Sequence, residues 1–405
     1  MFHDKTLRAN PEEHALKAEA ERLAPLFEAK GPENEAAGQL SPETVTELRG
    51  NGFFGMMVPK ELGGADCTPL QTLSVVESLC HSDSATGWVT MAANVATASA
   101  AAFLPDEGVR TVFAKPGAMV AGAGAPRGKA EIDGNGYRLS GTWTYGSGCL
   151  HCDWIHAGAM IYENGAPRMI PGTNTPESRI FVVPVEQVEF LGNWDVLGLR
   201  ATGSVDYAIR DVYVPHEMTH SASEVVGKRG GNGYRIGVVG FSALGHTGFA
   251  LGHGRRILDE LLALVTSPTG RPSPLASLGG SDAFKQDYAV AEGKLRAARA
   301  FVYDVWSDIQ DTVDKSEPVS VRQITLARLA LNHATNAMME ISVFAHRAGG
   351  GVALHAGPLQ RTLRDSFAAT QHVMVSDNAL RDCGLDFLGL AEGKRWTPRG
   401  LVDAN

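Results

Sequence analysis

The alternation of hydrophobic and polar residues changes character twice along the chain. From Pro11 to about Ala114, apolar residues such as Ala20, Leu23 and Phe27 recur at spacings of three and four, which predicts amphipathic helices. Between about residues 115 and 221 the pattern changes to short apolar runs separated by glycine and proline, which predicts strands. These runs cover residues 137–139, 154–157, 180–185 and 207–214.

Long helical patterns return after Gly233. They cover residues 284–311 and 319–347, and a last helix is expected over residues 358–388, after the break at Gly349, Gly350 and Gly351. Such long helices after a strand-rich segment suggest a four-helix bundle. The pattern predicts an α+β protein with three domains: an N-terminal α-helical domain at residues 1–114, a central β domain at 115–222 and a C-terminal four-helix bundle at 223–405.

Composition and charge exclude several classes of protein. The chain has 405 residues, 44% of them hydrophobic, and a net charge of −9, which is typical of an ordinary globular protein. A chain of this length can bury a large cofactor site. No lysine-rich or arginine-rich run is present, so we expect no nucleic-acid partner.

The cysteines and the N-terminal residues give an expectation for the cellular compartment. Five cysteines, an odd number in so long a chain, form no disulfide framework and fit a reducing compartment. The N-terminus lacks the apolar core of a secretory signal, so we expect a cytoplasmic protein. The uncharged stretch at residues 85–104 approaches membrane length, but it is mostly alanine and carries Thr90 and Asn94. A buried helix is favoured there, and no membrane association is expected.

Two motifs resemble metal sites without the necessary context. The pentad from His216 to His220 matches the zinc-protease pattern, which needs a helix that places both histidines on one face. The pentad follows a strand that ends at Pro215, and no third ligand stands at a short helical spacing. Cys149 and Cys152 have no second pair to complete a structural zinc site. We therefore expect a polar surface loop, free thiols in a half-buried strand or turn, and no metal.

The glycine-rich segments are candidates for cofactor binding. Residues 122–128 have one residue too many for a dinucleotide fingerprint and precede a hairpin instead of a helix, which excludes a Rossmann site. Residues 139–148 and 192–204 alternate small, hydroxyl and aromatic side chains between glycines. Such strands can hold a planar ring while a hydroxyl bonds its edge. The same pattern fits a tightly packed sheet with ordinary turns, and the residues alone leave both interpretations open.

Four segments in the right order resemble the acyl-CoA dehydrogenase superfamily over nearly the whole chain. They are the glycine and proline signature at residues 52–64, the strand at 141–148, the pieces at 197–200 and 211–215, and the triple glycine with the segment at 359–365. The resemblance implies an N-terminal α-helical domain, a central β-barrel-like domain and a C-terminal four-helix bundle. It also implies a homotetramer that binds flavin at subunit contacts.

The segment after Arg364 and Asp365 departs from the dehydrogenases. Those enzymes remove a proton from a thioester with a glutamate, but here the chain continues through His372 without a carboxylate, and the alternative base position near Tyr234 holds none either. The Arg-Asp pair followed by His372 is similar instead to the group D flavin monooxygenases, such as the oxygenase component of 4-hydroxyphenylacetate hydroxylase. Members of that group receive reduced flavin from a separate reductase and activate dioxygen as a C4a-hydroperoxide.

The resemblance implies roles for individual residues. His372 is expected to contact substrate and to donate a hydrogen bond to the peroxide, exchanging protons with it by titrating near neutral pH. Ser147 is expected to bond the N5 region of the flavin, with Tyr145 against the ring. Further candidate flavin contacts are Arg200, Thr202, Ser204, Arg271, Gly349 and Gly350, and Arg127 is a candidate substrate contact. Taken alone, His372 also fits a structural histidine on a helix face, and Arg127 a solvated surface charge.

The sequence therefore predicts the oxygenase component of a two-component monooxygenase. It would use reduced FMN or FAD from a separate NAD(P)H:flavin reductase, together with O2, to hydroxylate an aromatic or heteroaromatic small molecule. The alternative is an acyl-CoA dehydrogenase with FAD and a displaced catalytic base. A third possibility is a catalytically silent flavin-binding or bundle-forming protein. The residues do not identify the substrate or exclude oxidation at nitrogen or sulfur.

Overall fold

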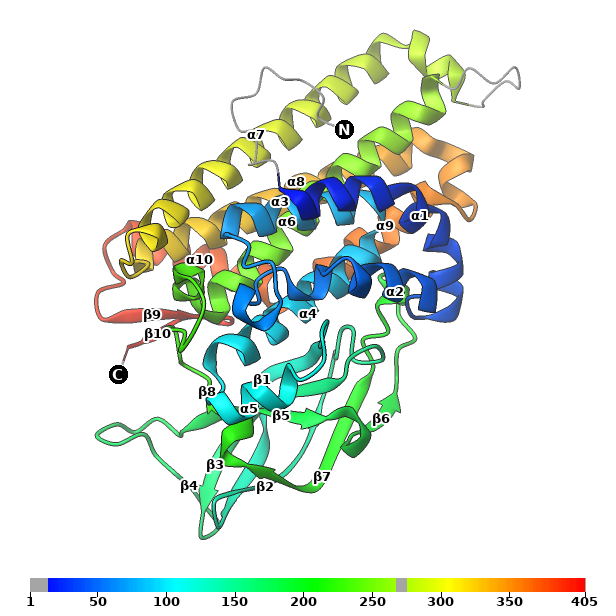
Figure 1. The fold of residues 1–405 in the computed structure, drawn as a ribbon. Helices are drawn as coiled ribbons and strands as arrows, with labels where there is room; N and C mark the ends of the chain where they lie inside the picture. The colour runs from blue at the N-terminus through cyan, green and yellow to red at the C-terminus, as the bar shows by residue number, and fades with distance from the viewer. Residues whose placement is uncertain (1–13, 267–274, 405) are drawn as a thin grey trace.

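The computed structural model describes residues 14–266 and 275–404. Its helices and its large sheet form separate layers, with the helices above the sheet in Figure 1. The chain builds helices first, then strands and then helices again, as the hydrophobic pattern predicts. The predicted α+β class is therefore confirmed.

The N-terminal helices have well-defined starts. Their bounds are α1 (Ala15–Ala37), α2 (Pro42–Gly50), α3 (Pro69–Ser82), α4 (Ser84–Phe103) and α5 (Asp106–Val112). A capping box between Thr68 and Gln71 begins α3, and Asp83 begins α4 by accepting hydrogen bonds from the amide and hydroxyl of Thr86. Helix α4 is alanine-rich and buried on nearly all sides, which confirms the expected buried helix. Within the described ranges, no helix has the length and apolarity that crossing a membrane requires.

The strands from β1 to β8 form one mixed sheet. Their order is β6-β7-β2-β1-β3-β5-β8, with β4 paired to β3. The bounds are β1 (Val120–Asp133), β2 (Gly136–Trp143), β3 (Trp154–Glu163), β4 (Ala166–Pro167), β5 (Ser178–Pro184), β6 (Glu189–Gly192), β7 (Asp206–Pro215) and β8 (Thr219–Ser221). β1 pairs antiparallel with β2 and parallel with β3. The four predicted runs lie in β2, β3, β5 and β7, except that Val185 falls just after β5.

Strand β1 carries the glycine-rich segment at residues 122–128, which the hydrophobic pattern did not assign to a strand. Its pairing with β3 shifts register between Ala123 and Gly128. A Cβ at Gly128 would lie 2.5 Å from the ring of Trp143, which is fully buried and stacks on Tyr207 with 5.5 Å between ring centroids. The packing of the sheet therefore requires this glycine, and no bound phosphate is needed to explain it.

The C-terminal part is helical, as predicted. It contains α6 (Gly237–Thr266), α7 (Asp282–Asp314), α8 (Val321–Leu354), α9 (Pro358–Ala369) and α10 (Asp377–Phe387), followed by a hairpin of β9 (Lys394–Thr397) and β10 (Gly400–Asp403). Figure 1 shows α7 as a long helix on the outer side of the molecule. Gly350 has a φ of 47° and a ψ of −128°, so the triple glycine kinks α8 near its end.

The single helix expected over residues 358–388 is wrong, because α9 and α10 are separate helices. His372 lies between them with an extended backbone, at a φ of −72° and a ψ of 139°. Its ring Nδ1 accepts a hydrogen bond from the Met374 amide at 3.4 Å, so a side chain replaces the helical carbonyl as the acceptor. The break therefore places His372 in an inter-helix turn and not on a helix face.

Candidate functional site

A chain of three hydroxyl groups joins the loop after β2 to the loop that leads into β7. Ser147 Oγ lies 2.7 Å from Ser204 Oγ, which lies 2.7 Å from Thr202 Oγ1. The Thr202 hydroxyl donates to the Leu199 carbonyl at 2.8 Å, and the indole Nε1 of Trp88 donates to Ser147 at 3.1 Å. Thr202 and Ser204 are buried, whereas Ser147 is only half-buried. We call Ser147, Ser204 and Thr202 the hydroxyl chain.

The direction of the protons in the hydroxyl chain follows from these contacts, since each hydroxyl has one proton. Thr202 gives its proton to the Leu199 carbonyl, so Ser204 must donate to Thr202, and Ser147 must donate to Ser204. Ser147 also accepts from Trp88 and keeps one lone pair. Its oxygen is therefore an acceptor toward any further group that approaches it.

Trp88 connects the hydroxyl chain to two histidines. Its ring meets His246 edge-on with 5.0 Å between centroids, and it meets Phe249 at 5.1 Å and His372 at 5.9 Å. The rings of His246 and His372 stack at 3.9 Å with 25° between their planes. Trp88 comes from α4, His246 and Phe249 from α6, and His372 from the turn between α9 and α10. We call these four residues the aromatic cluster.

Both stacked histidines are neutral at neutral pH. Burial lowers the pKa of His246 to about 4, and burial, with smaller contributions from His246 and Arg328, holds the pKa of His372 well below its usual value. Nδ1 of His246 donates to the Ser242 carbonyl at 2.7 Å, whereas Nδ1 of His372 accepts from the Met374 amide. His372 therefore carries its proton on Nε2. The expected titration near neutral pH is wrong, and His372 is a neutral hydrogen-bond donor.

The loop that carries Thr202 is held against α9. A Cβ at Gly198 would lie 2.1 Å from the Arg364 carbonyl oxygen, so only glycine permits this approach. The Leu199 amide donates to the Asp365 carboxylate at 2.6 Å, and burial raises the pKa of that carboxyl to about 7. The Arg-Asp pair of the sequence therefore positions the hydroxyl chain through the backbone of its loop.

Tyr145 lies at the surface, two residues before Ser147. Its side chain is 69% exposed, and its φ of 63° is uncommon for a residue other than glycine. Trp194 packs against its ring with 6.3 Å between centroids, and Leu197 of the same loop is 60% exposed. An exposed apolar surface therefore lies on the same loop as Ser147, two residues before it.

Two of the three arginines proposed as ligand contacts, Arg127 and Arg200, are exposed. Arg200 lies 3.8 Å from Asp195, and its carbonyl accepts a hydrogen bond from the Trp194 indole. The Arg127 guanidinium of β1 donates to the Thr144 hydroxyl at 2.9 Å, so it lies beside the residue that follows the end of β2 and begins the Tyr145 loop. The structure places Arg200 on the loop of the hydroxyl chain and gives Arg127 no contact with the aromatic cluster among its described hydrogen bonds.

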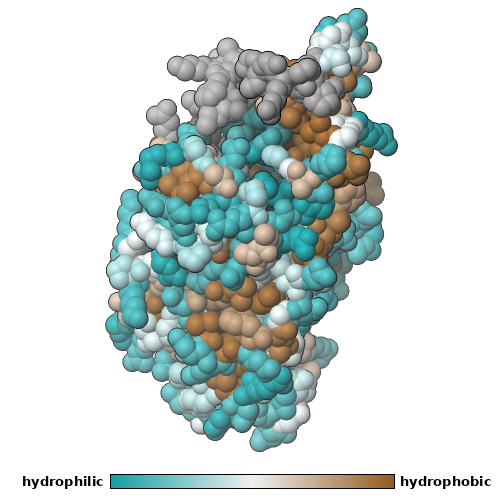
Figure 2. Space-filling model, turned by 90° about the vertical axis from the view of Figure 1, so that its right-hand side faces the viewer, coloured by the Kyte–Doolittle hydropathy of each residue, from teal (hydrophilic) through white to brown (hydrophobic). Residues whose placement is uncertain are grey.

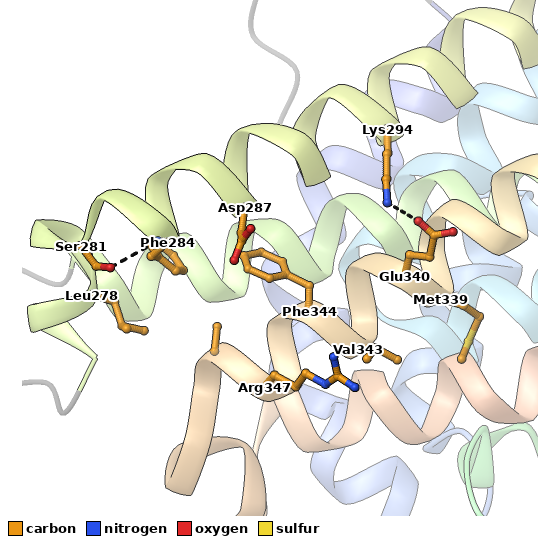
Figure 3. Close-up of a pocket in the computed structure, with 11 residues that line it drawn as sticks. Leu278, Ser281, Phe284, Asp287, Lys294, Met339, Glu340, Val343, Phe344 and Arg347 are labelled. Atoms are coloured by element: carbon orange, nitrogen blue, oxygen red, sulfur yellow. Dashed lines mark hydrogen bonds and ion pairs between the residues drawn. The ribbon is translucent and has the colours of Figure 1, made fainter.

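The glycine candidates lie elsewhere. Gly349 packs against Leu359 near the kink of α8, next to Gly350, and Arg271 lies outside the described residues. Close by, a groove of about 670 Å³ runs between α7 and α8, and Figure 3 shows Phe284 and Phe344 on it. A Lys294–Glu340 ion pair spans it. The groove contains no member of the hydroxyl chain or the aromatic cluster, so we assign no catalysis to it.

The two metal-like motifs have other roles in the structure. His216 lies in a 3-10 turn and His220 in β8, where it is buried with Nε2 3.0 Å from Ser99 Oγ. The expected polar surface loop is therefore wrong for His220. Cys149 and Cys152 are free thiols in a turn, buried more deeply than expected. Over residues 14–266 and 275–404, no three histidine, cysteine or carboxylate side chains are grouped to hold a metal.

The aromatic cluster has no carboxylate among the hydrogen bonds and ring contacts of its described residues. Tyr234, near the alternative base position, lies in the turn before α6 and donates its hydroxyl to the Met57 carbonyl. Beside the cluster, a cavity lined by Met91, Phe241 and Gly245 has a volume of about 10 Å³. It holds at most one water.

Sequence reasoning missed Trp88, His246 and Phe249. Trp88 could have been noticed because it is the one aromatic residue with a hydrogen-bond donor in an alanine-rich helix. His246 and Phe249 stand three residues apart, which places them on one face of a helix. Glycines at 245 and 248 flank them, and a Cβ at Gly245 would lie 3.1 Å from Met91 of α4. Gly245 therefore marks where α4 approaches α6, whereas a Cβ at Gly248 would lie 2.8 Å from Val76 of α3.

Family models match both helical parts of this helix–sheet–helix fold. The acyl-CoA dehydrogenase N-terminal domain matches residues 10–107, and the acyl-CoA dehydrogenase C-terminal domain matches residues 244–377. The fold and the two matched domains thus define a protein with the acyl-CoA dehydrogenase architecture. The chain belongs to the acyl-CoA dehydrogenase superfamily.

Similar proteins extend over almost the whole chain. An indole-3-acetate monooxygenase from Pseudomonas putida is 29% identical over 365 residues, which cover 86% of this chain and 87% of that protein. The oxygenase component of an FADH2-dependent resorcinol hydroxylase from Rhizobium sp. (strain MTP-10005) is 27% identical, over 91% of this chain and 92% of that protein. The structure of XiaF from Streptomyces sp. with FADH2 and glycerol has a TM-score of 0.83 at 23% identity, over 93% and 95% of the two chains.

Proposed function

We propose that this chain is the oxygenase component of a two-component, flavin-dependent monooxygenase that hydroxylates an aromatic or heteroaromatic molecule. The observation that carries the proposal is His372, a neutral ring with its Nε2 proton available, in a cluster where a dehydrogenase would need a carboxylate. The names of the Pseudomonas and Rhizobium relatives support the same reaction class.

The residues around Ser147 fit a reduced flavin. The exposed Tyr145 and the half-buried Trp194 that packs against it offer apolar surface to a planar ring system. Reduced flavin carries a proton on N5, whereas oxidised flavin has a bare nitrogen there. Ser147 can accept from N5–H with its remaining lone pair, but its own proton is directed to Ser204. The hydroxyl chain therefore favours the reduced form. Arg200, Arg271, Gly349 and Gly350 stay proposed contacts for the remainder of the cofactor.

Bound reduced flavin would supply the electrons that activate dioxygen. In this site His372 would hold its Nε2 proton toward the reacting oxygen, and it would do so without adding a charge. Trp88 and Phe249 would exclude water from the same space. Ser147 would fix the flavin edge by accepting a hydrogen bond, while Asp365 holds the loop of the hydroxyl chain in place.

The finer parts of the proposal concern partners and location. A separate NAD(P)H:flavin reductase would supply FMNH2 or FADH2, as the oxygenase-component name of the Rhizobium relative suggests. A homotetramer is supported by hydrophobic areas on the surface in Figure 2 and by the exposure of Leu354, Leu388 and Leu390 at 72%, 77% and 60%. The five free cysteines support a reducing cytoplasm.

The proposal is tested with the purified chain, a flavin reductase, FMN or FAD, and ¹⁸O2. We expect oxygen consumption that depends on the reductase, and one ¹⁸O atom in hydroxylated indole-3-acetate or resorcinol. A protein that arrives with tightly bound FAD, and is reduced by an acyl-CoA without oxygen, would overturn the proposal in favour of a dehydrogenase. A protein that shows neither activity would be a silent flavin binder.

A further inference from the structure

We propose that His246 determines substrate specificity by accepting a hydrogen bond from a ring N–H or O–H group of the aromatic substrate. The inference rests on the proposed function, because it places the substrate ring beside the aromatic cluster. His372 would then serve the reacting oxygen, and His246 would recognise one polar atom on an otherwise apolar molecule.

The hydrogen bonds of His246 fix it as an acceptor. Its Nδ1 lies 2.7 Å from the Ser242 carbonyl oxygen, which has no proton to give, so Nδ1 carries the ring proton. The ring is neutral at neutral pH, since burial disfavours the charged form. Nε2 therefore presents a lone pair, and Ser242 fixes the tautomer.

That lone pair has no partner in the structure. Nε2 of His246 is buried, and the described residues offer it no hydrogen-bond donor. An acceptor that is removed from water without a partner destabilises the folded state, so buried polar atoms of this kind are normally satisfied. A bound molecule with an N–H or O–H group satisfies it.

The neighbouring ring, His372, has the opposite hydrogen-bonding role at Nε2. His372 stacks on His246 at 3.9 Å and carries its proton on Nε2, because its Nδ1 accepts from the Met374 amide. One acceptor and one donor thus lie side by side on two stacked rings. The two rings are distinct in role, since each is fixed by a different backbone contact.

Most other neighbours of His246 are apolar, although the buried Arg328 is close enough to help lower its pKa, and the Ser242 hydroxyl lies 3.5 Å from Nδ1. Trp88 meets its ring edge-on at 5.0 Å, and Phe249 lies against Trp88. The neighbouring Gly245 lies close to Met91, so helices α4 and α6 enclose the ring from two sides. Apolar surroundings of this kind favour a flat, apolar ligand, and the few polar contacts of that ligand then determine its specificity.

A shared metal ion does not explain the histidine pair. Rings stacked with 25° between their planes do not point their nitrogens at a common centre. Nδ1 of each ring is already used by a backbone group. In the described part of the chain no third metal ligand joins them.

The chemical class that follows is an aromatic molecule with one ring-borne donor, such as an indole N–H or a phenol O–H. An analogue of equal shape without the donor would leave the His246 acceptor unsatisfied. Discrimination of this kind is strong because the cost of the unpaired acceptor adds to the lost hydrogen bond. The site should therefore reject isosteric ring ethers and fluoroarenes.

The inference is tested first by binding, with the flavin-free chain and calorimetry. Indole-3-acetate is compared with benzofuran-3-acetate, and resorcinol with 1,3-difluorobenzene. We expect each donor-bearing probe to bind about tenfold more tightly than its isostere. The pair with the larger ratio distinguishes an N–H from an O–H ligand. Equal affinities within both pairs, or no binding of either donor probe, would overturn the inference.

Variants of His246 then assign the discrimination to this residue. His246→Leu should reduce the affinity ratio to about one, whereas His246→Gln, which retains an acceptor oxygen, should keep part of it. Phe249→Leu is the matched control from the same helix, and it should weaken both members of a probe pair alike. An unchanged affinity ratio in His246→Leu would overturn the inference. If His246→Leu does not fold, the affinity ratios of His246→Gln and of the wild type are compared instead.

Failure of this inference is distinct from failure of the proposed function. Reduced-flavin binding and reductase-dependent oxygen consumption test the function and do not involve the probe pairs. Normal oxygen consumption with equal probe affinities would overturn only the role of His246. If the protein distinguished the probes but did not bind reduced flavin, the proposed function would be overturned. The role of His246 in binding an aromatic ligand would still stand.

Discussion

Ser147 and Ser204 lie 2.7 Å apart, Oγ to Oγ, and the proton between them belongs to Ser147. The assignment follows from the far end of the hydroxyl chain, where Thr202 gives its proton to the Leu199 carbonyl. At the opposite end of the hydroxyl chain, Ser147 can therefore only accept a hydrogen bond from a further ligand. A hydroxyl that would otherwise bond either redox state of a flavin is thereby directed toward the reduced one.

The first prediction concerns Ser147 itself. Ser147→Ala should weaken the binding of reduced flavin by about 0.5–1.5 kcal/mol, the net contribution of one neutral hydrogen bond. Oxidised flavin should be affected less, because Ser147 offers it no proton. Anaerobic titration with FMNH2 and FADH2, beside the oxidised forms, measures both effects. Equal affinity for reduced flavin in variant and parent would show Ser147 to be a turn residue only.

The second prediction concerns the direction of the hydroxyl chain. Ser204→Ala removes the acceptor of the Ser147 proton and frees that proton to face the ligand. The preference for reduced over oxidised flavin should shrink by about 1 kcal/mol, or about fivefold in the ratio of dissociation constants. Ser223→Ala, in an exposed loop, is the control. A preference that stays unchanged would mean that the proton assignment has no effect on the cofactor.

The third prediction concerns His372. His372→Ala should fold and bind reduced flavin, because the hydroxyl chain lies on other segments. The assisted oxygen-transfer step should fall by about 10²- to 10⁴-fold, so that hydrogen peroxide is released in place of hydroxylated product. His372→Gln keeps a neutral N–H donor and should retain part of the coupling. The ratio of product to oxygen consumed is the measurement, and full coupling in a folded His372→Ala would reopen the dehydrogenase alternative.

The fourth prediction concerns pH and stability through Asp365. Burial raises its folded-state pKa to about 7, above the unfolded value of about 4. The folded state thus favours the protonated carboxyl, so its contribution is fully present below about pH 4 and is lost as the pH rises through about 7. The slope should reach at most about 1.4 kcal/mol per pH unit.

Asp365→Asn isolates this effect because it retains the oxygen that accepts from the Leu199 amide. The free energy of unfolding in urea, measured from pH 4.5 to 8, should decline less with pH in the variant than in the parent. Buried histidines such as His253, whose pKa burial lowers to about 4, act in the opposite direction in both proteins. Parallel pH profiles for variant and parent would contradict the raised pKa.

The fifth prediction concerns metals. Chelators should leave activity unchanged, because His216 and His220 lie in a turn and a strand and face different partners. Elemental analysis of the purified protein, before and after treatment with EDTA, is the measurement. Stoichiometric zinc, with loss of activity on its removal, would contradict the prediction.

Local patterns explain why much of the fold is predictable from the sequence. The spacing of apolar residues is set by the period of the helix or strand, so helices such as α4 and strands such as β7 are predictable from the sequence. Strand β1 was harder to predict because its glycines are required by residues of other strands, such as Trp143 against Gly128 and His156 against Gly122. The break before α10 was missed because His372 competes for a backbone amide, and hydrophobic spacing carries no sign of that.

By itself, the sequence determined the order of helices and strands, the absence of a carboxylate after Asp365, and the positions of Ser147 and His372 as candidates. Only the tertiary structure decided that Trp88 links the two, that His246 stacks on His372, and that both rings are neutral. The physical reason is that the direction of a hydroxyl proton, a histidine tautomer and a buried pKa all depend on partners brought from distant segments by packing.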